Sequence, residues 1–164
     1  MTRIHPSADI HPDAKIGEGV TIWAFAHIGP NAEIDDNCMI GSNALVDCVV
    51  GAGSRIQAGA QLYNGVHIGS NVFVGPGVIT TNDILPRVGG EWGDRFRETI
   101  IRHNAAIGAN STIVCGNTIG AFASIGAGSV VCQDIKPRWL ARGNPAQHIR
   151  ELPHRATGRV EVNP

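Results

Sequence analysis

Aromatic side chains are scarce in this 164-residue sequence, and its positive and negative charges nearly cancel. Phe, Trp and Tyr make up 5% of the chain, and 13 Lys and Arg stand against 14 Asp and Glu, a formal net charge of -1. The lack of a clustered basic excess excludes a typical nucleic-acid-binding protein. The sequence also lacks the run of about eighteen apolar residues that a membrane-spanning helix needs, and its N-terminus lacks the apolar stretch of a signal peptide. We therefore expect a cytoplasmic protein with no nucleic-acid or membrane partner.

Cysteine is also sparse, and its spacing does not indicate a metal site. The four cysteines form no Cys-x-x-Cys motif and no metal-type pattern with histidine. A free cysteine in a protein interior behaves as a small hydrophobic residue. We therefore predict buried thiols and no metal ion at these positions, which are Cys38, Cys48, Cys115 and Cys132.

Branched aliphatic residues, in contrast, recur every six residues along most of the chain. A first series is regular, a second begins two residues early, and a third follows a gap. Repetition at a fixed short period is the signature of a solenoid. The repeat positions are Ile4, Ile10, Ile16, Ile22, Ile28, Ile34, Ile40 and Val46, then Val50, Ile56, Leu62, Ile68, Val74 and Thr80, and finally Ile101, Ile107, Ile113, Ile119, Ile125 and Val131.

Strand geometry explains why this repeat makes a triangular coil. Alternate side chains of a strand point to the same face, so the repeat position and the small residue two before it both point inward. The glycine or polar residue that follows lets the chain turn a corner. Three units complete one coil, and successive coils stack at the strand spacing of about 4.8 Å. The units predict an all-β solenoid of about six to seven coils over residues 1–135.

Two segments break the repeat. Residues 82–98 contain Pro86, three glycines and seven charged residues, and we expect them to form an extruded loop. A loop of this length in a compact domain is usually functional. Residues 136–164 form a C-terminal segment, in which Pro145 is expected to start a short helix over Ala146–Leu152. This helix would cover the open end of the coil, and the last residues would form a tail.

The repeat and the Gly-Asn-Pro-Ala sequence at Gly143–Ala146 resemble the hexapeptide-repeat acyltransferases. Further segments narrow the resemblance to N-acetyltransferases that acetylate the 3-amino group of nucleotide-linked amino sugars, such as UDP-2-acetamido-3-amino-glucuronate or dTDP-3-amino-3,6-dideoxyhexoses. The resemblance covers roughly residues 4–150. Its segments are 105–116, 125–131, Ile22-Trp23 with His27-Ile28, and Thr81-Asn82-Asp83 with Pro86-Arg87.

This resemblance implies a left-handed parallel β-helix that forms a homotrimer, with active sites between neighbouring subunits. It also implies that acetyl-CoA is the acyl donor and that a UDP- or dTDP-linked amino sugar is the acceptor, in cell-surface polysaccharide or deoxysugar biosynthesis. The amine attacks the thioester directly, an oxyanion develops, and the CoA thiolate leaves. The enzyme must position both substrates and donate to the oxyanion, and no metal is expected.

Three residues are candidates for catalysis. Asn82 matches the active-site asparagine of these enzymes, and its amide can orient the sugar or the amine but cannot act as a base. Asp83 can hold the amine or accept its proton. His67 precedes the repeat position Ile68, so it points outward near the start of the loop. The proton acceptor stays open among Asp83, His67 and the departing thiolate.

Three more residues are candidates for binding the nucleotide sugar. Asn64 is expected to stack one coil below Asn82. The guanidinium of Arg87 suits a phosphate or a sugar carboxylate. His27 is expected three coils below Asn82, about 14 Å away, where only the distal part of an extended nucleotide sugar would reach it.

The resemblance places the pantetheine arm of acetyl-CoA along the C-terminal coils. Small side chains there allow a close approach, and the phosphates need cations near the end of the coil. The predicted residues for binding acetyl-CoA are Ala109, Ala127, Lys136, Arg142 and Pro145.

Three alternatives use the same coil. An O-acetyltransferase acting on a sugar, serine or another small hydroxyl acceptor normally needs a histidine beside the thioester, and no histidine lies between residues 104 and 147. A γ-type carbonic anhydrase needs three zinc-binding histidines from adjacent subunits, and His27, His67 and His103 lack the close pair expected of it. A non-catalytic solenoid would leave the irregular loop and the Gly-Asn-Pro-Ala sequence unexplained.

Overall fold

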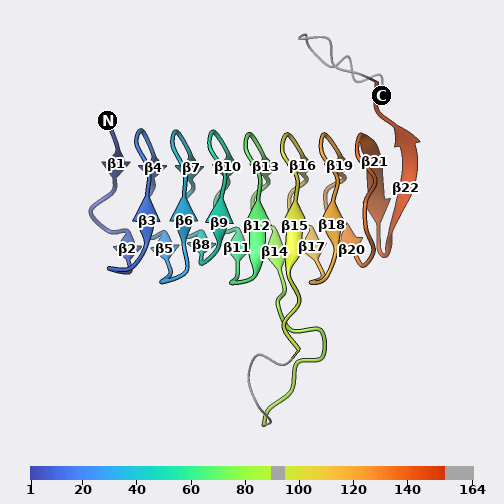
Figure 1. The fold of residues 1–164 in the computed structure, drawn as a ribbon, viewed down its shortest axis with the longest axis horizontal. Coiled ribbons are helices and arrows are strands. Elements are labelled where there is room, and N and C mark those ends of the chain that lie inside the picture. Colours follow the sequence, from blue (N-terminus) through green and yellow to red (C-terminus); the bar gives the residue numbers. More distant parts are fainter. Residues whose placement is uncertain (90–94, 154–164) are drawn as a thin grey trace.

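The computed structural model describes residues 1–89 and 95–153, which wind into a solenoid of about seven turns (Figure 1). Each complete turn contains three short strands, and each strand belongs to a different parallel sheet. The predicted all-β solenoid is therefore confirmed. None of the described residues forms a helix with the length and hydrophobicity needed to cross a membrane.

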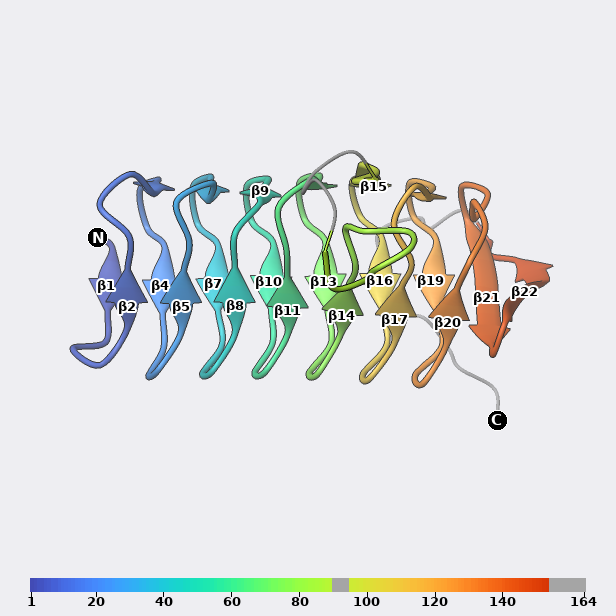
Figure 2. The ribbon, with the colours of Figure 1, turned by 90° about the horizontal axis from the view of Figure 1, so that it is seen from below.

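Three sheets form the three faces of the coil (Figure 2). Sheet A contains β1 (Arg3–Ile4), β4 (Thr21–Ile22), β7 (Met39–Ile40), β10 (Arg55–Ile56), β13 (Phe73–Val74), β16 (Ala106–Ile107), β19 (Ser124–Ile125), β21 (Trp139–Gly143) and β22 (Ala146–Glu151). Sheet B contains β2 (Asp9–Ile10), β5 (His27–Ile28), β8 (Leu45–Val46), β11 (Gln61–Leu62), β14 (Ile79–Thr80), β17 (Thr112–Ile113) and β20 (Val130–Val131). Sheet C contains β3 (Lys15–Ile16), β6 (Glu33–Ile34), β9 (Val49–Val50), β12 (Val66–Ile68), β15 (Thr99–Ile101) and β18 (Thr118–Ile119).

The pairing register confirms the predicted stacking of the repeat positions. Val46 pairs with Leu62 across the shortened turn, so the two-residue deletion is absorbed at a corner. Ile68 pairs with Ile101, so the long insertion between them leaves the stacking intact. Strand order therefore gives the height of any residue along the coil, at about 4.8 Å for each turn.

The inward ladder of repeat positions forms the core. Every repeat position from Ile22 to Val131 is buried, whereas Ile4 is 47% exposed. Ile4 belongs to β1, which is the edge strand of sheet A among the described residues. Burial of this continuous apolar ladder is the main stabilising contribution to the fold, because hydrophobic stabilisation scales with the apolar area removed from water.

Glycine after a repeat position allows successive corners to stack closely. A Cβ atom at Gly108 would lie 2.5 Å from the backbone nitrogen of Ala127 and 2.8 Å from its Cα atom. These are backbone atoms of the next turn, and they cannot rotate away as a flexible side chain can. Gly59 has open space around it, but its φ of 68° lies in the left-handed region that favours glycine.

Alanine substitutions at these two glycines should separate the effect of close approach on stability from the effect of backbone conformation. We expect Gly108→Ala to lower the free energy of unfolding by about 3 kcal/mol, the upper end of the overpacking range, because the clash is with backbone. Gly59→Ala should cost about 1 kcal/mol through its φ angle alone. Urea denaturation of both variants tests this, and equal losses would contradict the close-approach argument.

The predicted C-terminal helix over Ala146–Leu152 is wrong. Ala146–Glu151 form strand β22, which pairs antiparallel with β21. β21 continues sheet A, so its free edge would carry unpaired backbone N–H and C=O groups, and a returning strand pairs them directly. Gly143, with a φ of 105°, lies where the chain turns back. The predicted tail after this hairpin lies outside the described residues from position 154 onward.

Three of the four cysteines are buried as predicted, but Cys132 is exposed. Cys132 directly follows the inward-pointing Val131, at the corner where the chain leaves sheet B. Alternation therefore turns its side chain outward. Cys48 lies within the core, and burial raises the pKa of its thiol.

Candidate functional site

The insertion between β14 and β15 projects from the corner between sheets B and C (Figure 1). Its two ends run antiparallel, with a bridge between Asp83 and Phe96. The N–H of Arg97 donates to the carbonyl of Asn82 at 3.0 Å, and the N–H of Ile84 donates to the carbonyl of Arg95 at 3.4 Å. We call these paired ends, residues 82–85 and 95–97, the loop root. Residues 90–94 of the predicted loop 82–98 lie outside the described residues.

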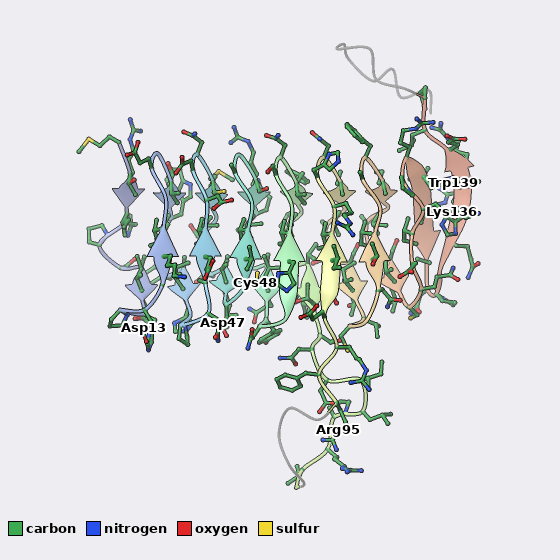
Figure 3. All side chains as sticks on the ribbon, viewed as in Figure 1. Asp13, Asp47, Cys48, Arg95, Lys136 and Trp139 are labelled. Carbon is green, nitrogen blue, oxygen red and sulfur yellow. The ribbon has the colours of Figure 1, made fainter. Side chains whose placement is uncertain are left out.

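An ion pair joins the two arms of the loop root. Arg95 Nε lies 3.3 Å from Asp83 Oδ1, and Arg95 Nη2 lies 3.4 Å from Asp83 Oδ2. Asp83 Oδ1 also accepts the backbone N–H of Leu85 at 2.8 Å. The Asp83 and Arg95 side chains are only 15% and 19% exposed, although the loop projects into solvent (Figure 3). Arg95 is not among the residues predicted from the sequence, because nothing in the spacing singles it out among the charged residues of the loop.

The hydrogen bond from the Leu85 N–H, followed by Arg95 and the nearby charge of Arg87, lowers the pKa of Asp83. A carboxylate with a lowered folded-state pKa contributes stability that is present above the ordinary pKa of about 4 and is lost as pH falls through the lowered value. The carboxylate of Asp83 is therefore charged, and its contacts intact, at neutral pH.

An acid titration should show this directly. We expect the NMR titration midpoint of the Asp83 carboxyl to lie below about 3.9, the ordinary value for aspartate. Arg95→Gln should move the midpoint upward, because it removes a cation that favours the charged form. A midpoint at or above the ordinary value in the unaltered protein would contradict the lowered pKa.

His67 lies one turn below the residues that follow the insertion. It is the central residue of β12, its side chain points outward, and its backbone is paired with Ile100 of β15. His67 Nε2 lies 3.9 Å from a carboxylate oxygen of Glu98, the residue at the end of the insertion. Both side chains are substantially exposed, so this is a loose contact.

Asn64 and Asn82 occupy matching places on neighbouring turns. Asn64 follows β11 by two residues and Asn82 follows β14 by two residues, and β11 pairs with β14. Asn64 is exposed and Asn82 is half-buried. Arg87 is exposed and lies further out along the insertion, where its charge still acts on Asp83. The fold therefore brings Asn64, Asn82 and Asp83 to one corner of the coil.

His27 lies well away from this corner. Its strand β5 is three strands from β14 in sheet B, about 14 Å along the coil. His27 therefore lies at the height that the repeat predicts, and its contact with the distal part of a nucleotide sugar stays a prediction. Its Nδ1 lies 2.7 Å from a carboxylate oxygen of Asp9. Within residues 1–89 and 95–153, no group of three or more His, Cys, Asp or Glu side chains is arranged to hold a metal ion.

The predicted acetyl-CoA residues fall into two places. Ala109 and Ala127 occupy matching places on successive turns at the corner between sheets A and B, and Arg142 lies on the next turn, above Gly126. Lys136 lies at the other end of β21, beyond the reach of Arg142. Lys136 Nζ is 5.6 Å from the centre of the Trp139 ring (Figure 3).

Pro145 is exposed in the turn that joins β21 to β22. It follows Arg142 by three residues, so it lies at the same end of β21 as the stacked alanines. The structure therefore groups Pro145 with Arg142 and separates both from Lys136.

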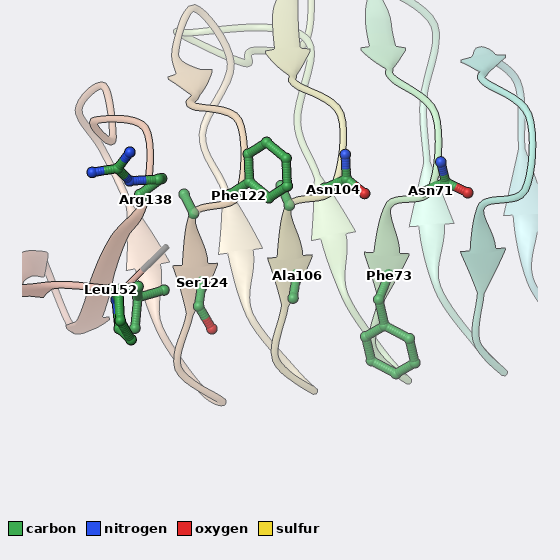
Figure 4. A pocket seen from close by; sticks show the side chains of 11 residues that line it. Asn71, Phe73, Asn104, Ala106, Phe122, Ser124, Arg138 and Leu152 are labelled. Carbon is green, nitrogen blue, oxygen red and sulfur yellow. The ribbon is translucent and has the colours of Figure 1, made fainter. Parts of the chain in front are cut away.

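A pocket of about 320 Å³ on sheet A was not predicted (Figure 4). Phe73 and Leu152 line it together with Asn104, Phe122 and Arg138. Phe122 has a φ of 60°, in the same corner column as Asn104 and Arg138, which also have positive φ angles. An aromatic residue in this conformation is unusual, and only the three-dimensional structure reveals it. The pocket is on a different face from the loop root.

Family models match most of the coil. The bacterial transferase hexapeptide model (six repeats) matches residues 13–48 and 47–82, and the model for the hexapeptide repeat of succinyl-transferase matches residues 99–133. The first model ends at Asn82 and the second begins at Thr99, so the matches leave residues 83–98 of the insertion uncovered. They correspond to the stacked turns described above.

Two curated proteins are similar over shorter segments. The dTDP-3-amino-3,6-dideoxy-alpha-D-galactopyranose 3-N-acetyltransferase of Aneurinibacillus thermoaerophilus is 56% identical over 54 residues, which are 33% of this chain and 28% of that protein. The bifunctional protein GlmU of Rubrobacter xylanophilus is 44% identical over 61 residues, which are 37% of this chain and 13% of that protein. The matched segments thus span less than a third of the length of these relatives.

Two solved structures are similar over most of this chain. A hexapeptide-repeat acetyltransferase from Vibrio cholerae, complexed with acetyl coenzyme A, has 25% identity and a TM-score of 0.59, covering 85% of this chain and 71% of that one. A mutant perosamine N-acetyltransferase from Caulobacter crescentus, complexed with CoA and GDP-perosamine, has 26% identity and a TM-score of 0.53. The second comparison covers 92% of this chain and 57% of that one.

Proposed function

Because the chain belongs to the hexapeptide-repeat acetyltransferase family, we propose that it transfers the acetyl group of acetyl-CoA to the 3-amino group of a nucleotide-linked amino sugar. The observation that carries this proposal is the loop root. It holds Asn82 and Asp83 at the corner above Asn64, and His67 lies on the neighbouring strand near Glu98 at the end of the insertion. The similarity to a dTDP-3-amino-sugar 3-N-acetyltransferase supports this substrate class.

The reaction needs a neutral amine, a polarised thioester and a site for one proton. The amine nitrogen attacks the carbonyl carbon of the thioester, the C–S bond breaks, and the CoA thiolate leaves. Asn82 orients the sugar through its amide, and backbone N–H groups of the coil donate to the developing oxyanion. The nitrogen then loses a proton, and an amide and free CoA are the products.

Asp83 is poorly suited to accept that proton. Both of its carboxylate oxygens are engaged within the loop root, and its lowered pKa makes it a weak base. His67, with Glu98 near its Nε2 atom, is the remaining side-chain candidate among those predicted. The departing thiolate is the alternative acceptor, and it needs no protein base.

The matching places of Ala109 and Ala127, with Arg142 on the turn after them, support a path for acetyl-CoA along the C-terminal turns. The two alanines leave room for the pantetheine arm, and the exposed guanidinium of Arg142 suits its phosphates. Pro145 borders the same end of the path. Lys136 would contribute only if the nucleotide portion crossed to the opposite end of β21.

The same proposal includes a left-handed coil, a homotrimer and a cytoplasmic location. Three flat faces suit cyclic assembly, and the insertion exposes Leu85 and Val88 away from its own coil. A neighbouring subunit would cover such side chains. Sedimentation equilibrium at three times the mass of one chain would support the trimer.

Acetyl-CoA-dependent thiol release tests the function. The acceptors are UDP- and dTDP-linked 3-amino and 4-amino sugars, with serine and a simple sugar as hydroxyl controls. We expect turnover with one nucleotide-linked 3-amino sugar. Turnover with hydroxyl acceptors alone would overturn the amino-sugar assignment, and absence of both turnover and CoA binding would overturn the transferase function.

A further inference from the structure

We propose that Asp83 is a positioning residue, whose ion pair with Arg95 holds Asn82 in place at the loop root. This inference rests on the proposed acetyltransferase function. Asp83 and Arg95 together hold the two arms of the insertion, and neither of them transfers a proton in the reaction. Arg95 becomes as important to the reaction as Asp83, although it lies twelve residues further along the chain.

The first support is the limited exposure of the pair. The side chains of Asp83 and Arg95 are 15% and 19% exposed, although Leu85, whose N–H Asp83 accepts, is an exposed residue. An ion pair on an open surface contributes little because water screens it. A pair with two contacts and limited exposure is screened less, so it can contribute to holding the arms together.

The second support is the position of Asn82 between two anchors. On one side, Thr81 is tied to the coil, because its N–H donates to the carbonyl of Ile113 at 3.0 Å and its Oγ1 accepts the N–H of Cys115 at 3.0 Å. On the other side, the carbonyl of Asn82 accepts the N–H of Arg97 across the loop root. Without the Asp83–Arg95 ion pair, only backbone hydrogen bonds would connect the two arms of the loop root beside Asn82.

The third support is the way that Asp83 uses its oxygens. Oδ1 accepts from both the Leu85 N–H and Arg95 Nε, and Oδ2 accepts from Arg95 Nη2. Asparagine at this position keeps an oxygen acceptor for the Leu85 N–H but loses the charge that holds Arg95. The variant Asp83→Asn therefore removes the ion pair and preserves the local turn.

A double-mutant cycle tests the pair in the acetyl-transfer assay. Asp83→Asn and Arg95→Gln should each lower kcat by about tenfold to a hundredfold, because a small misplacement of the reacting groups is costly. The double variant should be no slower than the slower single variant, because both changes break the same contact. Arg95→Lys keeps the charge and should recover part of the loss.

The pH dependence of kcat separates positioning from proton transfer. If Asp83 only positions Asn82, the profile of Asp83→Asn keeps the shape seen in the unaltered protein. A much larger loss in Asp83→Asn than in Arg95→Gln, together with disappearance of the acidic limb, would make Asp83 the base and overturn the proposal. The control Glu33→Gln breaks the exposed ion pair with Lys15, far along the coil, and should leave kcat unchanged.

Hydrogen exchange of the Arg97 amide measures how often the loop root opens, and it does not depend on catalysis. Exchange should accelerate at least about tenfold in Asp83→Asn and in Arg95→Gln, and to a similar extent in both, while Glu33→Gln leaves it unchanged. Unchanged exchange in both loop variants would overturn the role of the pair. If the unaltered protein acetylates none of the acceptors, the proposed function fails, and the exchange result still decides whether the pair holds the loop root.

Discussion

Replacing Asn82 with alanine is expected to lower kcat/KM for acetyl transfer to the nucleotide amino sugar by about 10²-fold, with little change in stability. The Asn82 side chain is half-buried at the loop root, while its backbone carbonyl, which Arg97 holds, is the same in the variant. The substitution therefore removes the amide but keeps the backbone contact. Steady-state kinetics with the acceptor identified in the thiol-release assay measures the loss.

A matched control lies at the same corner of the coil. Asn31 follows β5, three strands below β14 in sheet B, and its exposed side chain bonds to Asp47. Asn31→Ala removes an identical amide far from the loop root, so kcat/KM should stay within about twofold of the unaltered protein. Equal losses in the two variants would show that Asn82 has no special role in the reaction.

The largest loss of stability is expected from a cavity in the middle of the ladder. Ile107 is fully buried between Val74 of the preceding turn and Ile125 of the next turn. The strand spacing of about 4.8 Å is held by backbone hydrogen bonds, so neighbouring turns cannot collapse into the space. Ile107→Ala should lower the free energy of unfolding by about 2–5 kcal/mol, and Ile107→Val by about 0.5–1.5 kcal/mol.

Chemical denaturation at one fixed protein concentration measures both effects, because assembly would make stability depend on concentration. Ile149 of β22 supplies the control, since it is 45% exposed. Ile149→Ala should change stability by no more than about 0.5 kcal/mol. A loss for Ile107→Ala as small as the control would mean that the ladder tolerates empty space.

Much of the candidate site followed from the repeat. Counting units across the two-residue deletion predicts Asn64 one turn below Asn82 and His67 near the insertion. Each turn repeats the same alternation and the same corners, so counting residues amounts to measuring height along the coil. The confirmed pairing of Gln61 with Ile79 and of Ile68 with Ile101 is the reason why these predictions hold.

Residues that lie outside the repeat could not be found in this way. The partner of Asp83 depends on how two irregular arms come together, and no period places Arg95 opposite it. Phe122, which lines the sheet A pocket, adopts a left-handed backbone conformation that the sequence around it does not predict. The ion pair arises from a contact between two arms with no common register, and Leu152 reaches the pocket from beyond the last turn of the repeat.

The sequence by itself determined the coil, its core ladder and the point where the chain leaves it, because a six-residue period leaves only one way to bury every repeat position. Tertiary structure decided the C-terminal hairpin and the Asp83–Arg95 pair. The segment Ala146–Glu151 became a strand because the edge of β21 offered it backbone partners. Asp83 became a structural anion because the returning arm brought Arg95 within 3.4 Å of it. In both cases the outcome depends on a contact with another segment of the chain, which the local sequence does not specify.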